Sequence, residues 1–254
     1  MALTSSTMTK HFQSFDDQSD PTTVAPRLKL LRAELARRGL DGFIVPRSDE
    51  HQGEYVPKHA ERLAWLTAFT GSAGAAVVLA DKAAIFVDGR YTLQVRAQTD
   101  VAQFEPRDLV EEGPGRWLEG AAPEGGKIGY DPWLHTAQAV DALKASVAKA
   151  GATLVACKTN PIDAVWTDQP EAPTARAIVQ AANLAGEAAE AKRTRLAEET
   201  KAKQADALVL TMPDSICWLL NIRGDDVPHT PFALSFAILN GEGSTDLFID
   251  ERKI

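Results

Sequence analysis

Arg90 stands in the short segment DGRY (residues 88–91), where it follows an apolar run and a glycine. A guanidinium group offers a planar fork of N–H donors that suits carboxylate and carbonyl oxygens. The segment lies between a predicted strand and a predicted helix, so the side chain can project outward from a loop. Two interpretations stay open for Arg90: contact with a bound ligand, or a surface ion pair with Asp88.

Residues 47–55 (RSDEHQGEY) gather side chains that can ligate a divalent metal: Asp49, Glu50, His51 and Glu54. A metal ion needs several such donors converging on one point. This segment has one histidine, and the sequence has no H-E-x-x-H motif and only scattered histidines elsewhere. We therefore expect a polar loop after a strand, and we nominate no metal ligand and no catalytic residue.

Two further segments carry glycines or clustered charge. Residues 70–74 (TGSAG) lack the Lys-Ser/Thr ending of a P-loop and precede a strand, so they predict a tight turn. Residues 221–231 (NIRGDDVPHTP) hold four polar side chains in one loop: Arg223, Asp225, Asp226 and His229. A functional loop and an ion-paired connector are equally good interpretations of this second segment.

Composition limits the classes of function. The chain has 254 residues, which favours two domains, and a net charge of −8, which argues against nucleic-acid binding because phosphate contacts need clustered Lys and Arg. No apolar stretch is long enough to span a bilayer, so we expect no membrane association and a cytoplasmic location. Cys157 and Cys217 lie in apolar contexts that are typical of buried free thiols.

Periodicity in the first half predicts alternating helices and strands. Leucines at helical spacing predict a helix that ends at Gly39, followed by a buried strand in the GFIVP segment. The segment from 74 to 90 predicts a β-hairpin, and a helix is expected to start after Arg90. Another strand, a helix over 136–151 and a final strand follow. This alternation indicates an α/β fold.

The second half repeats part of this order. A charged helix, the strand segment ALVLT, a helix with Asp214 placed to cap it, and two further strands follow one another. A Trp-Leu pair precedes a glycine by the same interval in both halves, at Trp65 and Trp218, and a strand pair ends in aspartate in both, at Asp88 and Asp250. We infer a diverged internal duplication whose second copy is truncated.

The resulting domain plan has four parts. Residues 1–23 are expected to form a flexible tail and residues 24–157 the first domain. Residues 158–175 are rich in proline and lack periodicity, which predicts a linker. Residues 176–254 form the second, incomplete domain.

Five segments together resemble the long, cytosolic-type Xaa-Pro aminopeptidases (aminopeptidase P) of the creatinase–prolidase peptidase family: SDEHQGEY, FTGSAGAAVV, DGRYTLQ, VWTDQPEAP and CWLLNIRGDDVPHTPFALSFAIL. The resemblance covers nearly the whole chain after the N-terminal tail. It implies an α/β fold of two tandem creatinase N-terminal-type domains, each with a mixed sheet flanked by helices, the second apparently truncated.

In that family catalysis belongs to a third domain of pita-bread fold, which holds two divalent metals, usually manganese, between carboxylate and histidine ligands. Nothing in this sequence resembles that domain, so no metal ligand maps onto a residue here. The resemblance implies no cofactor in this chain and two Mn²⁺ ions in the missing domain. It also implies a substrate-binding role for Arg90, which resembles the arginine that reaches towards the substrate cleft.

The resemblance implies the non-catalytic N-terminal part of a metal-dependent hydrolase. The whole enzyme would remove the N-terminal residue from peptides with proline at the second position. This part would shape substrate access and help to form a homodimer, and it would be inactive alone. The alternative is a stand-alone, non-catalytic creatinase-like binding module.

Overall fold

The helix α1 (Val24–Arg37) opens the first unit of the computed structural model, which describes residues 19–254. Its buried residues include the three leucines whose spacing predicts it: Leu28, Leu31 and Leu35. Gly39 follows with φ of +68°, a left-handed conformation that glycine adopts without a steric penalty. The predicted end of this helix is confirmed.

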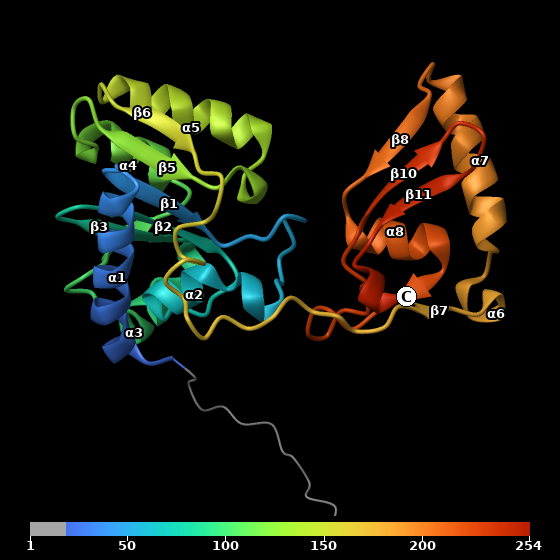
Figure 1. The fold of residues 1–254 in the computed structure, drawn as a ribbon, viewed down its shortest axis with the longest axis horizontal. Coiled ribbons are helices and arrows are strands. Elements are labelled where there is room, and N and C mark those ends of the chain that lie inside the picture. Colours follow the sequence, from blue (N-terminus) through green and yellow to red (C-terminus); the bar gives the residue numbers. More distant parts are fainter. Residues whose placement is uncertain (1–18) are drawn as a thin grey trace, which may run out of the picture.

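The first unit is built around one sheet (Figure 1). After α1 it contains β1 (Gly42–Pro46), α2 (Arg62–Thr67), β2 (Gly74–Leu79), β3 (Ala83–Val87), α3 (Gln94–Gln98), β4 (Glu105–Asp108), α4 (Gly113–Ala121), β5 (Lys127–Tyr130), α5 (Ala137–Lys149) and β6 (Thr153–Ala156). The 3-10 turn η1 (Pro21–Thr23) precedes α1, and three more lie between the later elements: η2 (Lys58–Ala60), η3 (Gly89–Tyr91) and η4 (Pro132–Leu134). The strand order is β4-β3-β2-β1-β5-β6.

This sheet is mixed, as the fold class predicts. The pairs β1–β2 and β2–β3 are antiparallel, and the outer pairs β3–β4, β1–β5 and β5–β6 are parallel. Alternate residues of each strand face opposite sides of the sheet, so each face carries its own core. One core packs α1 and α2 against Phe43 and Val78, and the other packs α4 and α5 against Ile44 and Phe86.

The second unit has fewer strands. It contains β7 (Ile178–Val179), α6 (Ala182–Ala185), α7 (Ala189–Ala202), β8 (Ala207–Leu210), α8 (Pro213–Leu220), β9 (Ile222–Arg223), β10 (Phe236–Asn240), β11 (Thr245–Phe248) and the turn η5 (Glu251–Lys253). Its main sheet has the order β11-β10-β8, and β7 pairs with β9. Both α7 and α8 contact the main sheet, beside its buried residues Ala237 and Leu239.

The two sheets share a register, which agrees with the inferred duplication. In the first, Val45 pairs with Ala76, and in the second Leu210 pairs with Ala237 at the corresponding position. Counting along the strands makes Phe86 of β3 equivalent to Phe248 of β11. Each of these strand pairs then ends in an aspartate that caps a 3-10 turn, η3 in one case and η5 in the other.

Two predictions about helix starts are wrong. Asp214 does not cap α8, because the N-cap residue is Met212 and the Asp214 carboxylate instead accepts the N–H of Ser215. The helix expected directly after Arg90 is broken into η3 and α3, because the Asp88 carboxylate binds the N–H of Arg90 and closes a tighter turn first.

The domain plan falls partly outside the described residues, because residues 1–18 of the expected tail are not among them. Ser19 donates hydrogen bonds to the carbonyls of Ala68 and Gln98, so the chain contacts the first unit from there on. Residues 158–175 contain no helix or strand. Trp166 of this segment stacks on Trp65 at 5.5 Å, which ties its first half to the first unit. The boundaries at 157 and 176 stay a prediction.

Candidate functional site

Arg90 projects from η3, the turn that follows β3. Its Nη2 lies 2.8 Å from Oδ2 of Asp88, and the Arg90 side chain is 61% exposed. Its guanidinium also lies 5.1 Å from the centre of the Tyr91 ring. Hydrogen bonding to Arg90 lowers the pKa of Asp88, and the same contact raises the pKa of Arg90. The surface ion pair expected for Arg90 is therefore present, and it holds the guanidinium at the surface.

The structure brings three of the sequence segments together beside Arg90. The Tyr91 hydroxyl accepts the N–H of Ser72 at 3.2 Å and lies 3.0 Å from the Ser72 hydroxyl. The Ser72 hydroxyl donates in turn to the Glu54 carboxylate at 3.3 Å. These hydrogen bonds from Ser72 lower the pKa of Tyr91. The surface around Arg90 thus offers a guanidinium, a carboxylate and two hydroxyl groups to a ligand.

The TGSAG segment bends at Ser72 and Ala73 and then enters β2 at Gly74; the tight turn expected here stays a prediction. A Cβ atom on Gly71 would collide with the Phe69 ring, and one on Gly74 would lie 3.0 Å from the Phe86 carbonyl oxygen. Phe69 is fully buried, so its ring has little freedom to move. The glycines therefore permit close packing, and the serine between them is the polar contribution of this segment to the Arg90 surface.

The loop at residues 47–55 is an ordered polar loop that also joins the two units. The buried Asp49 carboxylate accepts the N–H groups of His51 at 3.0 Å and Gly53 at 3.2 Å. The His51 ring stacks on Phe236 of β10 with ring centres 4.4 Å apart, and its Nδ1 lies 3.3 Å from the Thr211 carbonyl oxygen. This interdomain contact could not be predicted from sequence patterns, because it joins residues about 160 to 185 positions apart in the chain.

The loop at residues 221–231 behaves in part as an ion-paired connector. Asp226 is buried, and its Oδ2 lies 2.7 Å from Nζ of Lys253 and 2.7 Å from the backbone nitrogen of Leu234. Arg223 donates to the carbonyls of Cys217 and Ile222. These contacts explain Asp226 and Arg223 structurally, while a ligand-binding role for Asp225 or His229 stays untested.

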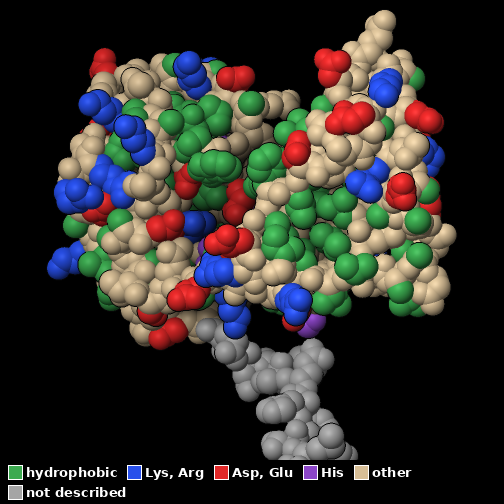
Figure 2. Space-filling view, turned by 45° about the vertical axis from the view of Figure 1, so that its right-hand side comes forward, with side chains coloured by type: hydrophobic (Ala, Val, Ile, Leu, Met, Phe, Trp, Pro, Cys, Tyr) green, Lys and Arg blue, Asp and Glu red, His purple; other side chains and the backbone are tan. Residues whose placement is uncertain are grey.

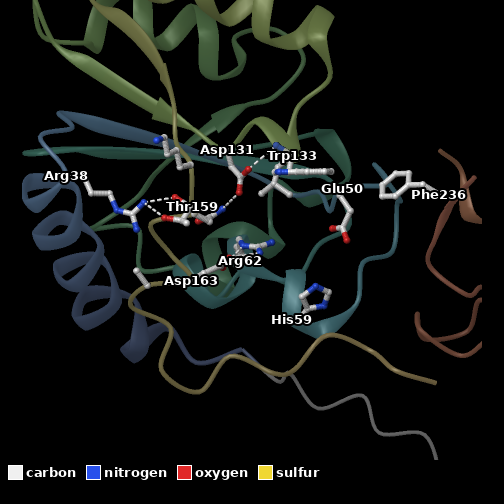
Figure 3. A pocket seen from close by; sticks show the side chains of 13 residues that line it. Arg38, Glu50, His59, Arg62, Asp131, Trp133, Thr159, Asp163 and Phe236 are labelled. Carbon is white, nitrogen blue, oxygen red and sulfur yellow. Dashed lines mark hydrogen bonds and ion pairs between the residues drawn. The ribbon is translucent and has the colours of Figure 1, made fainter. Parts of the chain in front are cut away.

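A cleft of about 660 Å³ is lined by the first unit and the 158–175 segment, with Phe236 as the lining residue from the second unit, and Figure 3 shows these side chains. At one end Arg38 donates to the Thr159 carbonyl. In the middle Arg62 and Asp163 form a two-pronged ion pair, with Nε to Oδ1 at 2.7 Å. At the other end, four residues face the opening between the units: Glu50, His59, Trp133 and Phe236.

Sequence reasoning missed this cleft, although one signal was present. Trp133 follows a strand in the segment DPWLHT, and a tryptophan directly after a strand end is a candidate for an exposed position. The His59 ring has Nδ1 buried without a hydrogen-bond partner in the described part of the chain. Burial lowers the pKa of His59, because removal from water disfavours the charged ring.

A metal centre has no support among residues 19–254. No group of three or more His, Cys, Asp or Glu side chains is placed there to hold a metal ion.

In the same residues no helix is long and apolar enough to cross a membrane. Within this range Cys157 and Cys217 are free thiols, and burial raises the pKa of each.

Comparison with known families explains the paired sheets. A model described as the creatinase/prolidase N-terminal domain matches residues 27–165, and a second model of the same description matches residues 168–254. The chain belongs to the creatinase/prolidase N-terminal domain family. The prediction of two tandem creatinase N-terminal domains is therefore confirmed. Such a tandem pair accounts for the shared register of the two sheets.

Similar proteins extend the comparison. The probable Xaa-Pro aminopeptidase P of Paracoccidioides brasiliensis is 37% identical over 232 residues, which are 90% of this chain and 37% of that protein. Its namesake from Neurospora crassa is 36% identical over 251 residues, 96% of this chain and 36% of that protein. This creatinase/prolidase chain therefore spans little more than a third of the length of these relatives.

A solved structure matches both domains at once. The crystal structure of X-prolyl aminopeptidase from Caenorhabditis elegans, described as a cytosolic enzyme with a di-nuclear active site, superposes with a TM-score of 0.84 at 30% identity. The match covers 91% of this chain and 40% of that one. It therefore extends to the relative placement of the two creatinase-type domains.

Proposed function

We propose that this chain is the non-catalytic N-terminal part of an Xaa-Pro aminopeptidase, a hydrolase that removes the N-terminal residue preceding proline. The observation that carries the proposal is the match over 91% of the chain to the C. elegans enzyme, together with the named relatives. The substrate would be a peptide with proline at the second position. We further propose a cytoplasmic location and a homodimer.

The metal ions of such an enzyme do not fit the side chains described here, since no set of three or more candidate ligands comes together among residues 19–254. We propose that two divalent ions, manganese in the first instance, are held by another part of the enzyme. No chemical step is assigned to residues of this chain. Its contribution is to shape access to the substrate cleft.

Arg90 is the residue proposed to touch substrate. Its guanidinium is 61% exposed, and Asp88 binds it through one side, at Nε and Nη2. The Nη1 group then has hydrogen-bond donors available for a peptide carbonyl or carboxylate. Glu54 stands nearby to accept a donor from the same ligand.

The experiment compares two purified proteins on a peptide that begins Arg-Pro-Pro, with manganese added. The 254-residue chain is expected to release no N-terminal arginine, and a longer protein that contains this chain and a metal-binding domain is expected to release it. Cleavage by the 254-residue chain would contradict the assignment as a non-catalytic part. An endogenous protein with an intact mass of 27.4 kDa would instead favour the binding-module alternative.

A further inference from the structure

The end of the interdomain cleft near Phe236 holds four side chains that the proposed function does not use. Trp133 and Glu50 come from the first domain, as does His59, and Phe236 comes from the second. Figure 3 shows Glu50 between Trp133 and His59, with Phe236 across the opening.

Trp133 presents an indole to solvent at the mouth of the cleft. The residue is 70% exposed, although Asp131 fixes its backbone by accepting the Trp133 N–H at 3.0 Å. An exposed indole on an anchored turn is a preformed surface for a flat or cationic group, because its ring face carries partial negative charge. Burying that face on binding also removes apolar area from water.

Glu50 supplies a carboxylate with unused hydrogen-bonding capacity. Its side chain is 34% exposed, and its ionic contact among the described residues is with Nε2 of His51 at 3.9 Å, which is too long for a hydrogen bond. The other two carboxylates of the cleft are engaged. Asp163 binds Arg62 through both oxygens, and Asp131 accepts the side-chain amide of Asn160.

His59 lines the cleft beside Glu50 (Figure 3). Its Nδ1 is buried among the described residues, so this atom is not a contact for a ligand in the cleft. Burial lowers the pKa of His59, which favours the uncharged ring, and an uncharged ring does not repel a cation bound at Glu50.

The two arginines of the cleft are each bound by acceptors. Arg38 is bound by Glu34 and by the Thr159 carbonyl, and Arg62 is bound by Asp163. Lys158 also lines the cleft. Figure 3 shows Thr159 and Arg38 at the opposite end from Glu50 and Phe236.

We propose that the Trp133 end of the cleft binds the guanidinium or alkylammonium group of a basic side chain. The cation donates to the Glu50 carboxylate, its face or methylenes lie on the Trp133 indole, and Phe236 borders the site from the second domain. Guanidinium fits best, because two of its N–H donors can bind the carboxylate while its plane stacks on the indole. This inference goes beyond the proposed function and does not depend on it.

The test is a titration of the purified 254-residue chain, followed by the nitrogen–proton NMR signal of the Trp133 indole, which the Trp133→Leu variant assigns. N-acetyl-L-arginine methylamide is expected to shift this signal saturably. N-acetyl-L-citrulline methylamide has nearly the same shape and no charge, and it is expected to bind at least tenfold more weakly. Equal binding of the two compounds would overturn the proposal.

Variants separate the site from general charge effects. Glu50→Gln keeps the shape of the side chain and is expected to weaken binding of the arginine compound at least tenfold. Glu111→Gln removes an equal charge from an exposed position in the same domain and is expected to leave binding unchanged. Unchanged binding in Glu50→Gln, with a native circular dichroism spectrum, would refute the site. A loss of binding in Glu111→Gln equal to that in Glu50→Gln would refute it too.

Two further probes distinguish the source of the cation, a peptide or a small molecule. Ethylguanidinium carries the binding group alone, and acetyl-Ala-Arg-Ala-amide carries it on a peptide. Tighter binding of the peptide by threefold or more supports a peptide side chain as the ligand. Equal affinities support a small guanidino compound, and no binding of either overturns the proposal.

Discussion

The two domains place equivalent phenylalanines in opposite environments. Phe86 of β3 is fully buried and meets the Trp117 ring of α4 at 6.1 Å, whereas Phe248 of β11 is 56% exposed. On the same face Ile44 is buried and Val209 is 65% exposed. Figure 2 shows hydrophobic side chains gathered on the surface of the second domain. The two domains therefore share their strand pairing but differ in how this face of the sheet is covered. In the first domain α4 and α5 bury it, so its side chains contribute more to stability there.

Other details are repeated with changed partners. Arg27 donates to the Trp65 carbonyl and lies 5.2 Å from its ring centre, and Lys192 donates to the Trp218 carbonyl and lies 4.5 Å from its ring centre. Lys192 is 2% exposed and needs a further acceptor, which Asn221 provides. The same contact with the helix end can thus be made by a lysine in one domain and an arginine in the other.

The aspartate–arginine turns show the same contrast. Asp88 holds Arg90, and Asp250 holds Arg252 with Nη2 to Oδ2 at 2.6 Å. The side chains next to the two arginines differ. Arg90 lies over the Tyr91 ring, and the Tyr91 hydroxyl lies within hydrogen-bond distance of the Ser72 hydroxyl. The turn itself is therefore a structural repeat, and the neighbouring side chains make the first copy a candidate for ligand contact.

The largest expected difference is in the paired phenylalanines. Phe86→Ala should lower the free energy of unfolding of the first domain by about 4 kcal/mol, because it removes a buried ring and leaves a cavity. Phe248→Ala should change that of the second domain by less than about 0.5 kcal/mol. Urea unfolding followed by hydrogen exchange of β2–β3 and β10–β11 amides would measure both. Equal losses in the two variants would contradict the conclusion that Phe86 is buried and Phe248 is exposed.

A buried ion pair should give the next largest effect. Asp226→Ala leaves the Lys253 ammonium buried without its carboxylate, and we expect a loss of about 3 kcal/mol in the second domain. Asp163→Ala removes the partner of Arg62 at a more exposed site and should cost about 1 kcal/mol or less. The double variant Asp226→Ala/Lys253→Met should recover much of the loss. No recovery would assign the effect to the Leu234 contact instead.

Substitutions of Arg90 and Arg252 should differ in their effect on activity and not in their effect on stability. In the longer enzyme Arg90→Ala is expected to lower kcat/KM by about 10- to 100-fold, the size of one lost hydrogen bond to a charged group. Arg252→Ala should stay within about twofold of the parent. Metal content and thermal unfolding serve as controls and should not change in either. Equal kinetics for Arg90→Ala and the parent enzyme would leave Arg90 with its ion-pair role alone.

The smallest expected effect is on how the free energy of unfolding of the first domain depends on pH. Burial lowers the pKa of His135 and of His59, both in the first domain, from the ordinary value of 6.5. The unfolded chain therefore takes up protons first as the pH falls below 6.5, and the first domain loses stability there. His135→Asn should flatten the decline of unfolding free energy between pH 7 and pH 5. An unchanged slope in that variant would assign the decline to other groups.

Much of the fold was predictable because it depends on local patterns. The leucine spacing of α1, the glycine at its end and the β2–β3 hairpin all follow from side-chain size and backbone freedom within a few residues. Asp214 shows the limit, since the sequence predicts it as the N-cap of α8, whereas the N-cap is Met212 and the helix begins at Pro213. Capping depends on backbone angles that the residue type alone does not fix.

The sequence by itself determined the fold class, the duplication and the exposed arginine turn, because these rest on periodicity and short spacings. Only the tertiary structure decided what surrounds that turn and what lines the cleft. Ser72 and Glu54 meet Tyr91 through packing between distant segments, and His51 meets Phe236 across the domains. Such contacts depend on how sheets and helices stack, and stacking is set by the whole core rather than by any single segment.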